Sequence, residues 1–271
     1  NFTNNTNWQN EIYRRGAQQN YQLSASGGSD KYQYFLSGGW NGEEGTLNPA
    51  EFGRYSIRFN QSANLFPKLK VGSNFTLARL NSIDVPDNNR VNQGGTVLSA
   101  LTTPPIIPVQ NPDGTYPQNP FQALENPVAI TRGSDSRSFT NKILGNLSAE
   151  YQFLPSLKLT STLGVEVNDN RSEFFLDPFT TGNGRGQRGF ASAGANNEII
   201  WQNENILSYN HTFNKVHSLD VIGGLTFRKS DYSGTFLSGR NFANSSIQTV
   251  NGASEKLDAS STKSGWAYIS Y

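Results

Sequence analysis

The chain has 271 residues, of which 35% are hydrophobic and 16% charged, and its net charge is +1. A near-neutral charge gives no general attraction to nucleic acid, and the absence of cysteine excludes disulfides, thiolate metal sites and cysteine nucleophiles. No run of about 18 apolar residues occurs, which excludes a membrane-spanning helix but leaves a membrane β-barrel open, because barrel strands alternate and keep mean hydropathy low.

Alternating apolar and polar residues recur along the chain and predict antiparallel β-strands. The alternating segments are about 17–27, 31–41, 52–65, 68–80, 139–153, 157–173, 195–213, 217–230 and 262–271. Successive side chains of a strand point to opposite faces, so each strand has one apolar face and one wet face. In the clearest segment the apolar residues are Leu157, Leu159, Leu163, Val165 and Val167. We expect this apolar face to meet lipid and Thr162, beside Leu163, to point inward.

The connections between the segments alternate between short and long. Short turns fall at 27–31, 65–68, 154–156 and 214–217, and long loops at 41–51, 81–138, 174–194 and 231–261. In an up-and-down sheet, alternate connections emerge at the same end, so one end carries tight turns and the other long loops. Outer-membrane barrels have short periplasmic turns and long extracellular loops, whereas a Greek-key sandwich has less reason for this rhythm.

The longest loop, 81–138, has apolar and proline-rich parts. Residues Val97 to Leu101 predict one or two helical turns, which Pro104 ends. Structureless loops of this length are uncommon and are usually functional or disordered. We therefore expect this loop to fold on the barrel or on a partner, with a flexible surface loop as the alternative.

The wet faces carry several charges, which we predict to face a water-filled or plugged lumen and to be candidates for binding cargo. These residues are Arg54, Arg58, Lys142, Glu150, Lys158, Glu166 and Arg228. A dry protein core rarely accepts so many charges. Aromatic residues near the short turns predict a girdle at the membrane interface; they are Phe66, Tyr151, Phe153, Tyr209 and Phe213.

Motifs for chemistry are weak, and we predict no catalytic residue, metal site or cofactor. Gly184 to Gly189 spell the dinucleotide pattern, but the sequence around them does not predict a βαβ unit, so a flexible loop fits better. His211 and His217 flank a short turn and fit surface histidines. The carboxylates of Asp84 and Asp87 match no known calcium loop, and solvated loop residues are the default interpretation.

The start of the chain carries a family resemblance. Its motifs are "WQNEI" at Trp8 to Ile12, "NYQLSASGG" at 20–28, Tyr34-Phe35 and "EEG" at 43–45, followed by "FGRYSIRFN" at 52–60. Further segments at 119–126 and 144–159 extend the likeness to nearly the whole chain. Together they resemble SusC/RagA-type TonB-linked outer-membrane proteins of Bacteroidetes. Each motif is an ordinary strand sequence, but the combination is specific.

The resemblance implies an outer-membrane importer of oligosaccharides or peptides. It implies a 22-stranded barrel, a SusD-like surface lipoprotein as lid, energy from the TonB complex and outer-membrane lipid around the barrel. Residues 1–271 show no TonB box and no plug, so we expect an internal part of a longer barrel. The alternative is a soluble secreted all-β glycan-binding module or carbohydrate-active enzyme, which would bury its apolar face under a second sheet.

Overall fold

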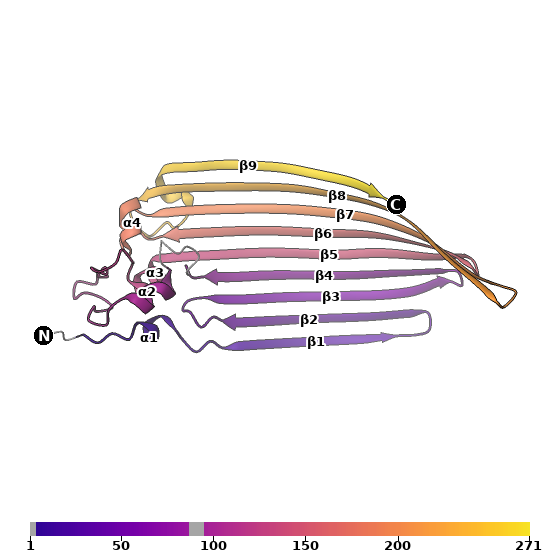
Figure 1. The fold of residues 1–271 in the computed structure, drawn as a ribbon, viewed down its shortest axis with the longest axis horizontal. Coiled ribbons are helices and arrows are strands. Elements are labelled where there is room, and N and C mark those ends of the chain that lie inside the picture. Colours follow the sequence, from indigo (N-terminus) through magenta and orange to yellow (C-terminus); the bar gives the residue numbers. More distant parts are fainter. Residues whose placement is uncertain (1–3, 87–94) are drawn as a thin grey trace.

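The computed structural model describes residues 4–86 and 95–271, whose strands form one antiparallel sheet in which each strand pairs with the next along the chain (Figure 1). The strands are β1 (Gln18–Gly28), β2 (Tyr32–Glu44), β3 (Glu51–Phe66), β4 (Leu69–Asp84), β5 (Ser134–Leu154), β6 (Leu157–Leu176), β7 (Phe190–Phe213), β8 (His217–Phe242) and β9 (Ala253–Ser270). The predicted all-β antiparallel fold is therefore confirmed, and each alternating segment is a strand.

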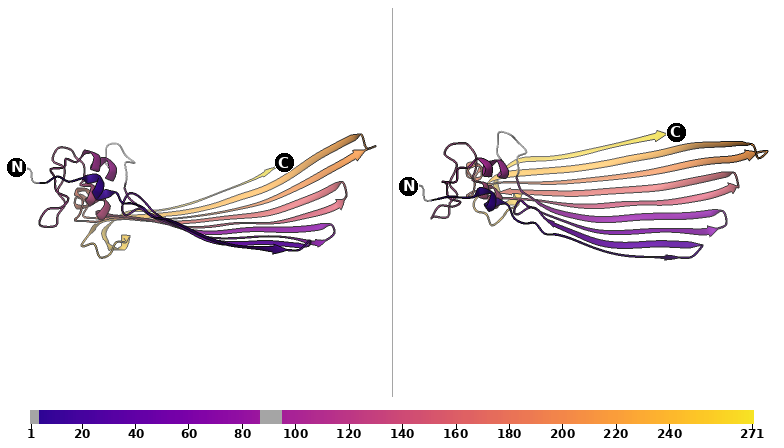
Figure 2. Two further views of the ribbon diagram at one scale, coloured as in Figure 1. Left: turned by 90° about the horizontal axis from the view of Figure 1, so that it is seen from below. Right: turned by 60° about the horizontal axis from the view of Figure 1, so that its bottom comes forward.

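Short helices gather at the end of the sheet opposite the tight turns (Figures 1 and 2). They are α1 (Trp8–Ile12), α2 (Thr96–Thr102), α3 (Pro127–Gly133), α4 (Gly182–Gln187) and the 3₁₀-helix η1 (Val250–Gly252). None of the helices in the described parts of the chain is long and apolar enough to cross a membrane. We call the two ends of the sheet the turn end and the loop end.

The turn end is stepped rather than flush. Strand β3 continues from Ala63, its last partner of β2, to Phe66, and β5 continues beyond Tyr151, its last partner of β4, to Leu154. Each hairpin therefore reaches further than the one before it, and the β7–β8 hairpin projects furthest (Figure 1). A constant stagger of this kind is what tilts strands when a sheet curls toward a barrel.

The pairing register gives the sheet one apolar and one polar face. Leu163 pairs with Leu147 and Asn203, whereas Thr162 pairs with Ser148 and Glu204. Paired residues of neighbouring strands share a face, so we call the side of Leu163 the apolar face and the side of Thr162 the polar face. Leu163 is 45% exposed, and the described residues contain a single sheet, so no second sheet covers the apolar face. This arrangement counts against a soluble sandwich.

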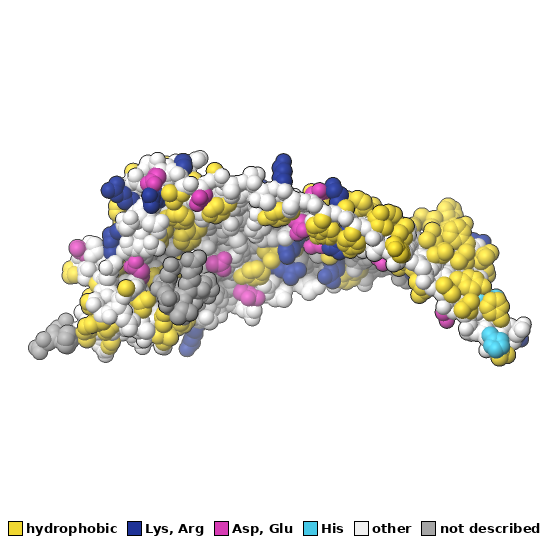
Figure 3. Space-filling model, turned by 45° about the horizontal axis from the view of Figure 1, so that its top comes forward, with side chains coloured by type: hydrophobic (Ala, Val, Ile, Leu, Met, Phe, Trp, Pro, Cys, Tyr) yellow, Lys and Arg dark blue, Asp and Glu magenta, His cyan; other side chains and the backbone are white. Residues whose placement is uncertain are grey.

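The apolar face is a band with polar borders. On β6 it runs from Leu157 to Val167, and the next residues on the same face are Asp169, Arg171 and Glu173. About 9 to 11 tilted residues cross a bilayer, which matches this length. Hydrophobic side chains accordingly gather toward the turn end, and acidic and basic side chains lie mostly toward the middle and the loop end (Figure 3).

Aromatic residues lie at both borders of the band. The predicted group near the turns includes Tyr151 and Phe153, whose rings meet edge to face at 4.8 Å. At the other border, on β1 to β3, Tyr21 stacks on Trp40 at 5.7 Å and Trp40 lies 6.4 Å from Tyr55. The second group was not predicted. Tyrosine and tryptophan favour membrane interfaces because their rings are apolar and their tips polar.

Strands β8 and β9 are longer than the sequence indicated. The prediction of a loop over 231–261 is wrong, because β8 continues to Phe242 and β9 begins at Ala253. Beyond the apolar band β8 carries small polar residues on both faces, such as Ser233 and Ser238, so it shows no alternation. The 174–194 loop is also shorter than predicted, because β6 reaches Leu176 and β7 begins at Phe190.

A small core organises the loop end. Its buried residues are Trp8, Ile12, Ala100, Ile107 and Val128. The indole Nε1 of Trp8 donates to the carbonyl of Pro104 at 3.2 Å, which ties α1 to the chain after α2. The helix predicted at Val97 to Leu101 is confirmed as α2, and the described part of the long loop that holds Ala100, Ile107 and Val128 packs on α1.

Asp177 joins two loops at the same end. Its carboxylate accepts hydrogen bonds from the backbone N–H of Phe179 at 2.8 Å and of Thr180 at 2.9 Å, and from the hydroxyl of Ser245 in the β8–β9 loop. Burial raises the pKa of Asp177, but these hydrogen bonds, with that of the Thr180 hydroxyl, lower it by more, so the net pKa lies below 3.8.

We expect Asp177→Asn to lower the free energy of opening of the β6–β7 and β8–β9 loops by about 1 kcal/mol at neutral pH. A carboxylate accepts hydrogen bonds more strongly than an amide does, and solvent limits the difference at this partly exposed position. The folded pKa is lowered, so the wild-type stabilisation is complete above pH 3.8 and disappears as the pH falls through the folded value. Amide hydrogen exchange at 178–181 and 243–248 measures this. Asp113→Asn is the control, since Asp113 bonds only within its own turn, to Thr115.

We expect Leu163→Arg to impair folding of the full-length parent barrel into vesicles by roughly 2 to 4 kcal/mol, and Thr162→Arg to do so much less. A spin label at Leu163 should be quenched by lipid-soluble and not by water-soluble reagents, with the opposite result at Thr162. A label at Leu163 that neither reagent reaches would place this face in a protein core.

Candidate functional site

The charged residues predicted to face a lumen all lie on the polar face. The continuous registers from β3 to β8 place there Arg54, Arg58, Lys142, Glu150, Lys158, Glu166 and Arg228. They are spread over several strands and do not form one cluster. Lys158 forms an ion pair with Glu150 at 3.3 Å near the turn end. Both side chains are more than a third exposed, so the pair contributes little stability.

Glu166 and Arg228 meet at a hollow in the middle of the polar face. It has a volume of about 230 Å³, and the polar side chains lining it are Asn146, Thr162, Glu166, Gln202, Glu204 and Arg228. Nη1 of Arg228 donates to Oε1 of Gln202 at 3.3 Å. Its buried Nε finds no hydrogen-bond partner among the described residues. We call this the central hollow; it offers a cation, carboxylates and amides to a polar ligand.

An aromatic pair borders the central hollow and was missed in the sequence. Trp266 and Tyr268 stack at 5.6 Å with an 8° angle between their rings, and the guanidinium of Arg228 lies 5.6 Å from the Trp266 ring centre. Their register partners Ser230 and Arg228 put both rings on the polar face. From residue type alone, two aromatic residues are expected on the apolar face, so only the pairing register shows that they lie on the polar face. Gln202 and Glu204 occupy alternate positions of β7, so the alternation along this strand could have predicted that both lie on the polar face.

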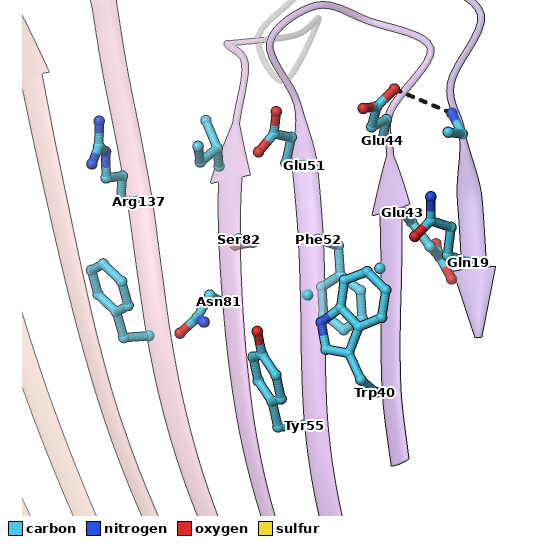
Figure 4. A pocket seen from close by; sticks show the side chains of 15 residues that line it. Gln19, Trp40, Glu43, Glu44, Glu51, Phe52, Tyr55, Asn81, Ser82 and Arg137 are labelled. Carbon is cyan, nitrogen blue, oxygen red and sulfur yellow. Dashed lines mark hydrogen bonds between the residues drawn. The ribbon is translucent and has the colours of Figure 1, made fainter. Parts of the chain in front are cut away.

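A larger hollow lies on the apolar face, at the loop-end border of the band (Figure 4). Its volume is about 480 Å³, and its lining includes Gln19, Trp40, Glu44, Glu51, Tyr55, Asn81, Ile83, Arg137 and Phe139. Gly42 and Gly53 also line it, on adjacent strands. We call this the outer hollow. It lies directly beyond the aromatic rings of Trp40 and Tyr55.

Each of the charged residues Arg137, Glu44 and Glu51 in the outer hollow has a polar or charged neighbour. Arg137 donates from Nε to Asp135 at 2.8 Å. Glu44 and Glu51 face each other in register, a repulsive arrangement for like charges. Glu51 lies 3.7 Å from the guanidinium of Arg14. Glu44 accepts from the backbone N–H of Ala17 at 3.3 Å, the bond drawn in Figure 4.

The remaining sequence motifs do not build a site. Gly184 to Gly189 follow β6 and precede its antiparallel neighbour β7, so they form no βαβ unit; instead of the expected flexible loop, Gly182–Gln187 form the helix α4, capped by Thr181. His211 lies against Phe213 at 4.5 Å beside the β7–β8 turn. Asp84 accepts a hydrogen bond from Ser82, and Asp87 lies outside the described residues. Residues 4–86 and 95–271 contain no group of three or more potential metal ligands.

No family model matches the chain, but individual proteins do. It is 30% identical to "TonB-dependent receptor P3" of Formosa agariphila over 253 residues, which are 91% of this chain and 25% of that protein. It is 24% identical to "TonB-dependent receptor SusC" of Bacteroides thetaiotaomicron over 67% of this chain and 20% of that protein. The chain therefore spans about a quarter or less of the length of these relatives.

Solved structures agree in fold. The RagAB peptide transporter gives a TM-score of 0.81 at 19% identity, covering 99% of this chain and 31% of the matched chain. The ferripyoverdine receptor of the outer membrane of Pseudomonas aeruginosa gives 0.53 at 11% identity, covering 94% of this chain and 33% of the receptor. The resemblance to SusC/RagA-type proteins and the fold predicted from the sequence are thus confirmed.

Proposed function

Because this chain is similar to TonB-dependent receptors over most of its length, we propose that residues 1–271 form part of the barrel wall of an outer-membrane nutrient importer. The observation that carries the proposal is the division of one continuous sheet into an apolar band on one face and charged side chains on the other. A barrel with that wall presents lipid with its apolar face and encloses a polar passage. The missing strands, a plug and a TonB box would come from other parts of a longer chain.

The orientation and energy source follow from the same proposal. The tight turns face the periplasm, and α1 to α4 stand at the extracellular mouth. The TonB complex of the inner membrane supplies the energy, acting on a segment outside residues 1–271. The relatives are transporters rather than enzymes, and we propose no catalytic activity.

The cargo is an oligosaccharide or a peptide that passes along the polar face. The central hollow supports this, because Arg228 has a buried donor without a partner among the described residues, Glu166 lines the same hollow, and the Trp266 ring lies against the guanidinium. Polar groups of both signs bind hydroxyls, amides and charged termini, and aromatic faces accept sugar rings or apolar side chains.

A SusD-like lipoprotein closes the mouth as a lid. Leu101 of α2 and Phe121 of the following loop are 61% and 68% exposed although their neighbours form the small core with Trp8. Exposed apolar side chains on an ordered loop are typical of a surface that binds another protein.

We expect Arg228→Gln in the full-length importer to lower cargo uptake by about tenfold, which corresponds to roughly 1.4 kcal/mol, without reducing barrel assembly. Arg79→Gln is the matched control, because Arg79 is an exposed arginine on the apolar face. Growth of a deletion strain complemented with each variant, on glycan mixtures or on peptides as the nutrient, measures uptake. Normal growth with Arg228→Gln on both nutrients would show that the central hollow does not contribute to cargo uptake.

We expect the double change Leu101→Ser and Phe121→Ser to weaken co-purification of the lipoprotein several-fold. Deleting the whole 96–118 segment would be less informative, since it also removes Ala100 and Ile107 from the core. Val216→Ser is the control: it removes a residue that is 75% exposed at the turn end. Unchanged co-purification of the double variant would show that the lid docks elsewhere.

A further inference from the structure

On the proposed barrel wall, on which this inference rests, the outer hollow lies where the wall leaves the hydrocarbon and enters the headgroup layer. Trp40 and Tyr55, at the border of the apolar band, form the edge of the hollow that is nearer the turn end. The lining continues on the same face to Asn81 and Arg137. The hollow is therefore continuous with the surface that contacts lipid chains. An amphiphile whose chains lie along the apolar band would place its headgroup in the hollow.

Two glycines open this space. A Cβ at Gly42 would lie 2.5 Å from the indole of Trp40, so only glycine lets that ring lie over the strand. A Cβ at Gly53 would meet nothing within 4 Å, so the space beside Tyr55 is empty. Larger residues at both positions would fill the hollow with protein.

The lining favours a neutral, hydroxyl-rich headgroup over a phosphate. Arg137 is the cation of the lining that the structure describes, and Asp135 already holds its guanidinium at 2.8 Å. The carboxylates of Glu44 and Glu51 repel anions but accept hydrogen bonds from hydroxyls. The amide of Gln19 donates and accepts, and that of Asn81 is left as a donor because its Oδ1 accepts from Nε of Arg79 at 3.4 Å. The rings of Trp40 and Tyr55 give apolar planes of the size of a sugar ring.

We propose that the outer hollow binds the sugar headgroup of a glycolipid in the outer leaflet. The sugar's C–H face packs against Trp40 or Tyr55, and its hydroxyls donate to Glu44 or Glu51 and accept from the amide nitrogen of Asn81. The lipid chains follow the apolar band toward Leu77. This site lies on the face opposite the central hollow, and binding there does not depend on cargo uptake.

The test uses the full-length receptor in phosphatidylcholine vesicles that contain a small fraction of either monogalactosyl diacylglycerol or phosphatidylglycerol. After extraction in mild detergent, native mass spectrometry counts the lipids that stay bound. The wild type should retain the galactolipid in preference to both phospholipids. Gly53→Phe should lower its retention at least about fivefold, because the new ring fills the hollow.

Gly223→Phe is the matched control, since Gly223 is also on the apolar face and a Cβ there also meets nothing within 4 Å. It should retain the galactolipid normally. Asn81→Leu, which removes a polar group without adding bulk, should also lower retention and covers the case that Gly53→Phe fails to assemble. Equal or better retention of phosphatidylglycerol, galactolipid retention no higher than that of phosphatidylcholine, or undiminished retention in both hollow variants would overturn the proposal.

Discussion

The backbone hydrogen bonds within the apolar band are the constraint on which the rest of the structure depends. Lipid offers no partner for an N–H or a carbonyl, so each strand must be bonded to its neighbours throughout the band. The registers satisfy this demand: the irregular pairings fall at Asn64/Phe66 and Gln152/Leu154, beside the turns, and at Ser238/Gly239, near the loop end. Within the band the described pairings are continuous, and this continuity keeps every side chain on its assigned face. The polar face and both hollows follow from it.

Much of the fold was predictable because a single physical signal covers it. A strand with lipid on one side and water on the other must alternate, so Leu157 to Val167 reveals both a strand and the orientation of its faces. The signal ends where the lipid ends. From Ser233 to Phe242 β8 lies beyond the band, its residues do not alternate, and Phe242 packs in a cluster with Phe175, so the hydropathy pattern does not predict this part of the strand. The helix at Thr96–Thr102 was detectable because Pro104 marks its end, but its packing on Trp8 depends on a contact between distant segments.

The candidate sites were predictable only in part. The alternation along each strand was enough to place Glu166 and Arg228 on the polar face. That both line one hollow depends on the register of β6, β7 and β8, which no local pattern encodes. Trp266 and Tyr268 carry a misleading signal, since aromatic residues on a polar face look like a lipid-facing pair. The outer hollow had no signal at all. It arises because Gly42 and Gly53 happen to pair across β2 and β3, and an absent side chain leaves no mark on hydropathy.

The two outermost strands have a consequence for the behaviour of this segment in isolation. β1 pairs only with β2 and β9 only with β8, so each leaves a row of backbone donors and acceptors without a partner in the described sheet. Such rows are templates for further strands. Residues 1–271 expressed alone would therefore act as a bifunctional monomer, able to add a copy of itself at either side. Repeated addition would build extended ribbons unless other strands paired with both edges.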